Sequence, residues 1–175
     1  IFPDLTAWEA ALSEATASLD RIPPCREMIG KSAASLRGAL DTIYDVMQKV
    51  ELVYVYAFLR SSENQGDSVS QDMTGRATRL YMTMRAQVAF LDPEILAVDH
   101  DTMLAWLDED CLKPYRHIIS DTLRAGKFVL DEQRETMLAN LSDAAGTASN
   151  AYDMLSSVDM KFPNVHDENG NEVPL

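Results

Sequence analysis

Three histidines and two cysteines are the residues of this 175-residue chain best suited to metal binding or nucleophilic catalysis, and they lie far apart. Metal-binding helices place two ligands three or four residues apart, and among the histidines this spacing occurs for His117 with Asp121. A zinc site needs three or four ligands, and the sequence contains no HExxH motif. We therefore expect His117 and Asp121 to form a solvated helix pair, or His117 to be partly buried, with a metal site as the weaker alternative.

Cys25 and Cys111 are the only cysteines, and they form no CxxC pair. Neither a disulfide framework nor a cysteine-rich zinc site is then available, which fits a reducing cytoplasm. One of these thiols could act as a nucleophile with His117 as its base, but no local motif supports that chemistry. We expect both thiols to be inert, as buried cysteines commonly are.

The C-terminal segment resembles part of a calcium loop. Asp167, Asn169 and Asn171 stand at its first, third and fifth positions, but Glu172 stands where the sixth position requires Gly. Asn169 and Gly170 together are a favoured hairpin turn, because both residues accept positive φ. We expect the turn rather than the ion, and we assign no catalytic, cofactor-binding or metal residue to this chain.

Methionine side chains could line an adaptable peptide-binding surface, and arginines on one helix face could meet a carboxylate. Met at helical spacing is more often part of a core, and arginines on a helix face are more often solvated than paired with a carboxylate. We expect the core or the solvated face for Met73, Met82, Met84, Met103, Arg76 and Arg79.

The stretch from Glu51 to Arg60, ELVYVYAFLR, contains eight consecutive apolar residues. Such a run suits a buried strand or a buried helix. Apolar residues before it recur every three or four positions, and neither Gly nor Pro interrupts residues 39–65. This pattern predicts a long helix that becomes apolar nearly all round, and we expect the run to lie at the centre of the core.

Helical periodicity, caps and turn signals divide the rest of the chain. Residues 61–70 (SSENQGDSVS) predict an exposed, mobile loop, and Asp99, His100 and Asp101 predict a cap for a helix at Thr102. The expected helices lie near residues 4–19, 32–59, 72–90, 93–96, 102–107, 115–126, 131–141 and 142–158, and the expected strands at residues 161–165 and 172–175. The predicted fold is mainly α, with long antiparallel helices in a domain of residues 1–158 and a β-hairpin in residues 159–175.

Composition limits the possible partners. The formal net charge is −13, which repels phosphate backbones and anionic lipid, and no apolar run approaches the roughly 20 residues needed to span a bilayer. We expect neither nucleic acid nor a membrane as a partner. No basic region followed by an apolar segment precedes the first helix, so we expect a cytoplasmic protein. Because the first residue is Ile rather than Met, we also expect that the beginning of the natural protein is missing.

Several segments follow one another in a recognisable order along nearly the whole chain. They are FPDLTAWEAAL, YVYAFLR with the polar SSENQGDSVSQ after it, FLDPEIL, LKPYRHII and LDEQRE. The last and most specific is AYDMLSSVDMKFPNVHDENGNEV, a helix that runs into a KFP strand and a DENG turn. In this order the segments resemble the N-terminal helical region of oligoendopeptidase F, a branch of the thimet-type M3 zinc metallopeptidases.

The resemblance implies an almost wholly helical fold that covers a deep channel, with an HExxH helix far downstream. Zinc, its ligands and the general-base Glu would then lie beyond Leu175, in a C-terminal catalytic domain that hydrolyses short peptides. This chain would form a wall of the substrate channel, would keep folded proteins out of it, and would be inactive alone. The alternative hypothesis is a free-standing acidic helical module that binds a partner helix.

Overall fold

The computed structural model describes residues 1–126, 132–156, 160 and 163–173, and it is mainly helical, which confirms the predicted fold class. The α-helices are α1 (Leu5–Ser18), α2 (Ala33–Glu63), α3 (Ser68–Val88), α4 (Leu91–Ala97), α5 (His100–Leu107), α6 (Arg116–Ala125) and α7 (Glu132–Met154). Short 3-10 helices are η1 (Leu19–Arg21), η2 (Pro23–Met28) and η3 (Asp110–Tyr115), and the strands are β1 (Val165–His166) and β2 (Glu172–Val173).

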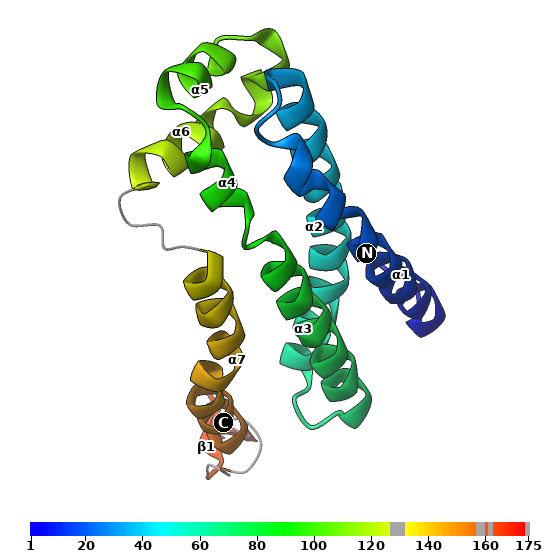
Figure 1. The fold of residues 1–175 in the computed structure, drawn as a ribbon. Helices are drawn as coiled ribbons and strands as arrows, with labels where there is room; N and C mark the ends of the chain where they lie inside the picture. Colours follow the sequence, from blue (N-terminus) through cyan, green and yellow to red (C-terminus); the bar gives the residue numbers. More distant parts are fainter. Residues whose placement is uncertain (127–131, 157–159, 161–162, 174–175) are drawn as a thin grey trace.

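Helix α2 is the central element, with α1 along one side and α3 along another (Figure 1). It begins where the Ser32 hydroxyl accepts a hydrogen bond from the Ser35 backbone N–H. Its buried residues recur every three or four positions and form one continuous stripe toward the core. They are Ala33, Leu36, Ala39, Leu40, Ile43, Val46, Val50, Val53 and Ala57.

The stretch ELVYVYAFLR is helical as predicted, but it is not buried all round. Val53 and Ala57 continue the buried stripe, whereas Leu52 is 44%, Val55 42% and Leu59 57% exposed. The expectation that this run is the centre of the core was therefore wrong. The neighbouring helices α1 and α3 cover only part of the surface of α2, and the apolar residues on the remaining surface face solvent.

The predicted loop at residues 61–70 is much shorter in the structure. Residues 61–63 extend α2 and residues 68–70 begin α3, so only residues 64–67 connect the two helices. The Asp67 carboxylate accepts hydrogen bonds from the backbone N–H groups of Val69 and Ser70 and from the Ser70 hydroxyl. This N-cap lets a polar sequence start a helix where its composition predicts a loop.

A polar cluster attaches η3 to the first half of α2. Arg37 Nε lies 2.7 Å from both carboxylate oxygens of Asp41, and Arg37 Nη1 donates to the backbone carbonyl of Cys111 at 2.8 Å. The Tyr115 hydroxyl donates to Asp41 at 2.7 Å, and the Tyr115 ring stacks on Tyr44. The cluster therefore positions the segment that leads into α6.

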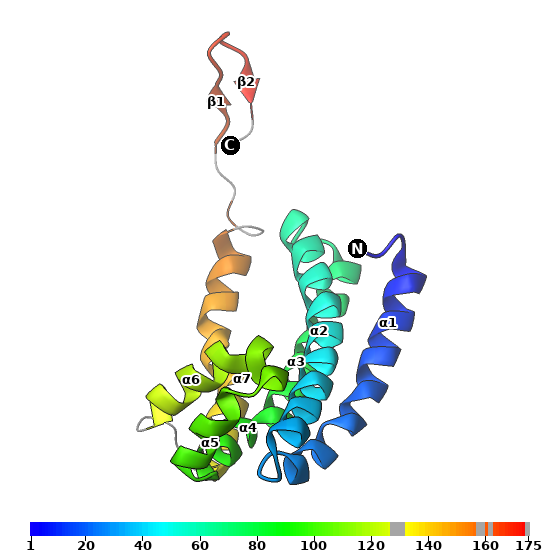
Figure 2. The ribbon, with the colours of Figure 1, turned by 90° about the horizontal axis from the view of Figure 1, so that it is seen from above.

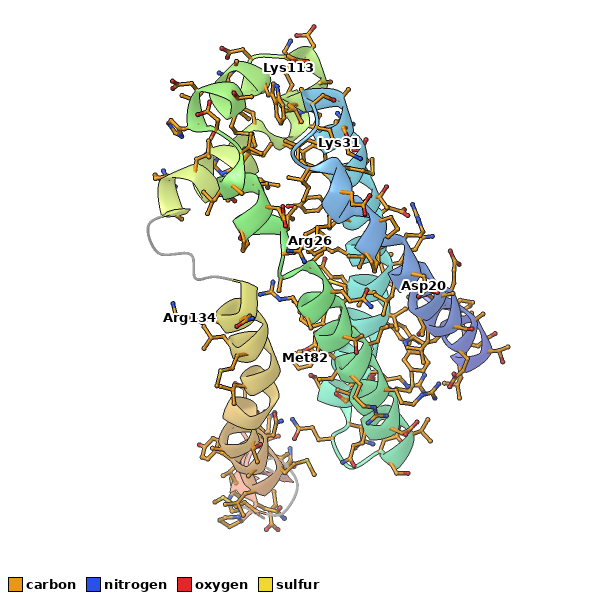
Figure 3. The ribbon with its side chains drawn as sticks, in the orientation of Figure 1. Asp20, Arg26, Lys31, Met82, Lys113 and Arg134 are labelled. Carbon is orange, nitrogen blue, oxygen red and sulfur yellow. The ribbon has the colours of Figure 1, made fainter. Side chains whose placement is uncertain are left out.

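Helix α7 lies beside α3, and Met82 lies on the α3 side that faces it (Figure 3). The sequence predicts a restart at Ser142 or Asp143, but α7 runs without interruption from Glu132 to Met154. Gly146 lies within it and does not end it. The predicted cap at Asp131 and the predicted helix end near Val158 lie outside the described residues.

The C-terminal hairpin projects away from the helices (Figure 2). Val165 pairs with Val173 and His166 with Glu172, so the connecting loop spans residues 167–171. Gly170 has φ +81°, and Asn169 is not in the positive-φ region, which corrects the predicted two-residue turn. The predicted strand ends at residues 161–162 and 174–175 lie outside the described residues.

None of the helices in the described part of the chain is long and apolar enough to cross a bilayer.

Candidate functional site

An open pocket of about 530 Å³ lies where the C-terminal end of α2, the first half of α3 and the last turns of α7 meet. Among the described residues that line it, most side chains are polar, and those with a charge are Arg79 on α3 and Asp153 on α7. The pocket is lined by Phe58, Ser61, Ser62, Gln65, Gln71, Thr74, Gly75, Thr78, Arg79, Asn150, Asp153 and Met154.

Several hydroxyl groups in this pocket donate hydrogen bonds to backbone carbonyls of α2 and α3. The hydroxyls of Ser61 and Ser62 each donate to the Phe58 carbonyl at 2.9 Å. The Thr74 hydroxyl lies 2.9 Å from the Ser70 carbonyl and 3.1 Å from the Ala57 carbonyl, both acceptors. These hydroxyls therefore present lone pairs to the pocket, and a ligand there would have to supply the hydrogen-bond donors.

An exposed apolar surface, which we call the α2 stripe, consists of Leu52, Val55 and Leu59. Spacings of three and four residues place these side chains on one face of the helix. The Phe58 ring, 49% exposed, is next to this face and forms part of the rim of the pocket. Side-chain burial would stabilise contact with a partner at this surface.

Helix α7 and the segment after it carry a second set of exposed apolar side chains. These residues are Met137, Leu138, Leu141, Tyr152, Met154, Leu155, Met160 and Val165, and they continue into the hairpin. Apolar side chains are therefore exposed along α7 and on the hairpin strand β1.

The predicted pair of His117 and Asp121 forms on α6, where His117 Nε2 lies 3.4 Å from an Asp121 carboxylate oxygen. His117 is 88% exposed, and Arg124 donates to the other oxygen of Asp121 at 2.8 Å. The pair is solvated, as expected. No three His, Cys, Asp or Glu side chains of the described residues are grouped in a way that could hold a metal ion.

The two cysteines lie in different surroundings. Cys25 is buried, and its thiol donates to the Arg21 carbonyl at 3.3 Å. Burial raises the pKa of the Cys25 thiol, so little thiolate is present at neutral pH. Cys111 is half-buried, and its sulfur lies 3.7 Å from a Glu109 carboxylate oxygen. The surroundings of Cys25 therefore disfavour a role as a nucleophile.

Arg76 differs from its predicted role on a solvated face. Its guanidinium makes a two-pronged hydrogen bond to the Glu9 carboxylate and lies 5.3 Å from the centre of the Trp8 ring. The hydrogen bond from Arg76 lowers the pKa of Glu9. The contact joins α1 to α3, and Glu9, 67 residues away in the chain, could not be identified as the partner from the local sequence.

The remaining predicted residues have structural positions. Met73, Met84 and Met103 are buried in the core, and Met82 is half-buried. The Asp99 carboxylate accepts a hydrogen bond from the Thr102 N–H at 3.0 Å, as the cap prediction requires, although His100 and Asp101 already belong to α5.

The loop of the hairpin uses the oxygens of Asp167 within itself. One carboxylate oxygen accepts from the backbone N–H groups of Asn169 and Asn171, and the other accepts from the Asn171 amide. These bonds lower the pKa of Asp167 and fold the loop that was predicted as a turn.

Comparison with known proteins agrees with this architecture. A family model described as Oligopeptidase F matches residues 94–162. Oligopeptidase PepF of Bacillus subtilis is 32% identical over 173 residues, which is 98% of this chain and 26% of that protein. The chain is related to oligoendopeptidase F along nearly all of its length. The predicted resemblance is thus confirmed.

A solved structure supports the same relationship. The crystal structure of oligoendopeptidase-F from Enterococcus faecium superposes with a TM-score of 0.86 and 25% identity, over 97% of this chain and 33% of that one. Group B oligopeptidase PepB of Streptococcus agalactiae is 27% identical over all of this chain and 29% of that protein. The chain therefore spans about a quarter to a third of the length of these oligoendopeptidase F relatives.

Proposed function

We propose that this chain is the N-terminal helical part of a cytoplasmic zinc oligopeptidase and forms one wall of the channel that receives short peptides. The observation that carries the proposal is the match to oligoendopeptidase-F over 97% of this chain at a TM-score of 0.86. In this proposal the chain restricts access of folded proteins, and the C-terminal catalytic domain cleaves the peptide.

The α2 stripe supports the proposal, because it is the apolar surface that a neighbouring domain would bury. Val53 and Ala57 on the same helix already pack into the core of this chain, so the stripe provides a second, separate contact face. Each large aliphatic side chain that becomes buried contributes about 1.5–3 kcal/mol. In the proposed enzyme, Leu52, Val55 and Leu59 contact the catalytic domain.

Zinc belongs to the catalytic domain in this proposal. The described residues of this chain do not fit a zinc site, because they provide no grouping of three potential ligands. Bound zinc would activate water for attack on the peptide carbonyl. We assign no step of that reaction to a residue of this chain, and we expect the chain to be inactive alone.

The length of the natural reading frame separates the proposal from the alternative of a free-standing interaction module. We expect several hundred further codons after Leu175, including an HExxH motif. A stop codon shortly after Leu175 would instead support the interaction module. The relationship to peptidases three to four times longer favours the first outcome.

A further inference from the structure

We infer that the pocket formed by α2, α3 and α7 binds a short free peptide by its two charged ends without cleaving it. The site goes beyond the proposed function, because it lies within this chain and needs neither zinc nor the catalytic domain. It shares with that function only the ligand class.

The ammonium end of such a peptide matches the hydrogen-bond acceptors of the pocket. The Ser61, Ser62 and Thr74 oxygens present lone pairs, since their protons are used on backbone carbonyls. Gln65 Oε1 is buried and has no hydrogen-bond partner among the described residues. A buried acceptor without a partner costs about 1–3 kcal/mol, and a ligand N–H would remove that cost.

Two side chains of opposite charge in the pocket can bind the two ends of a peptide. Asp153 on α7 can pair with an ammonium group, and Arg79 on α3 can pair with a carboxylate. The exposed Phe58 ring at the rim is a further contact surface for a cation. A peptide with both ends free has an ammonium group for Asp153 and a carboxylate for Arg79, whereas a peptide with blocked ends has neither group.

The size of the pocket and one of its glycines favour a peptide over a single ion. Its volume of about 530 Å³ lies within the range of small-molecule sites. Gly75 leaves its part of the wall open, because a Cβ there would meet only Arg79 Nη1, at 3.8 Å. A larger side chain at this position would extend into the space that the peptide needs.

The test is a titration of the folded, ¹⁵N-labelled chain with Ala-Ala-Ala, followed by amide shifts in two-dimensional NMR spectra. We expect saturable shifts at Gln65, Gln71 and Gly75 and no hydrolysis of the peptide. Arg79→Gln and Asp153→Asn should each weaken binding about tenfold, which is the loss expected for one charge-assisted hydrogen bond. Arg85→Gln and Asp20→Asn, which change exposed charges outside this pocket, are the matched controls.

Three further titrations complete the test. Gly75→Leu should weaken binding while it stabilises the helix, whereas Gly146→Leu on α7 should stabilise its helix and leave binding unchanged. N-acetyl-Ala-Ala-Ala-amide should not bind, and free alanine should bind more weakly than the tripeptide. Absence of saturable shifts, equal binding of the blocked peptide, or no effect of Arg79→Gln and Asp153→Asn would overturn the inference. Because binding and hydrolysis are read separately, the channel-wall proposal is not affected by this result.

Discussion

The indole N–H of Trp8 on α1 donates a hydrogen bond to the backbone carbonyl of Val53 on α2, at 3.1 Å and inside the core. Trp8 is fully buried, and the Arg76 guanidinium of α3 covers its ring. One side chain therefore connects α1, α2 and α3 at the level of the ELVYVYAFLR segment. The packing of this segment depends on a contact between residues that are 45 positions apart.

Removal of this hydrogen bond should lower stability. We expect Trp8→Phe to decrease the free energy of unfolding by about 1–3 kcal/mol, from the lost hydrogen bond and the smaller ring. Urea unfolding followed by circular dichroism measures the difference. Trp106→Phe, in the half-buried second tryptophan, is the control and should cost less than 1 kcal/mol, roughly the surface range. Equal losses in the two variants would show that the Trp8 contact has no special role.

Two valines of the same helix should respond differently to the same change. Val53 is 1% exposed and Val55 is 42% exposed. We expect Val53→Ala to cost about 2 kcal/mol and Val55→Ala to stay within about 0.5 kcal/mol. The measurement is again the free energy of unfolding in urea. A larger loss for Val55→Ala would mean that the face of α2 in contact with the core has been assigned wrongly.

The α2 stripe should make the chain associate with other apolar surfaces. We expect the triple variant Leu52→Ser, Val55→Ser and Leu59→Ser to bind less of the apolar dye ANS and to self-associate less, with little loss of stability. Dye fluorescence and sedimentation velocity report these changes. Val69→Ser, which removes an exposed apolar side chain from α3, should have a smaller effect. Unchanged dye binding in the triple variant would argue against the stripe as a contact surface.

Stability should fall in acid partly through Asp41. Hydrogen bonds from Arg37, and to a lesser extent from Tyr115, hold the pKa of Asp41 below its ordinary value. As the pH falls, Asp41 therefore takes up its proton at a higher pH in the unfolded chain than in the folded chain. The ionised Asp41 contributes its full share to the free energy of unfolding above the unfolded pKa of about 3.9. This share is lost as the pH falls through the lower, folded pKa.

Asp41→Asn should therefore flatten the decrease of unfolding free energy below about pH 5. Asp20→Asn is the control, since Asp20 is an exposed carboxylate on η1 (Figure 3). Parallel pH profiles for the wild type and Asp41→Asn would contradict a role for this carboxylate in acid sensitivity.

Local sequence signals predicted most of the helices but not which of their side chains would be buried or exposed. Periodicity and caps such as Asp4, Ser32 and Asp99 are local, so the starts of α1, α2 and α5 could be predicted closely. The exposure of Leu52, Val55 and Leu59 could not be predicted, because it depends on which neighbours reach the helix.

The pocket could not be predicted either. Gln65 and Arg79 meet Asn150 and Asp153 only after α7 has packed beside α3. Residues 61–70 gave the only local signal, a run of polar side chains, and composition predicted a mobile loop there. Residues 61–63 and 68–70 instead extend α2 and α3, and Ser61, Ser62 and Gln65 line the pocket.

The most direct test of the central claim is a peptidase assay of the purified chain with a quenched fluorescent peptide, with and without added zinc. The account predicts no cleavage above the protein-free background under either condition, because it assigns the zinc ligands and the general base to the catalytic domain. Zinc-dependent turnover that co-purifies with the chain and disappears on chelation would contradict the account.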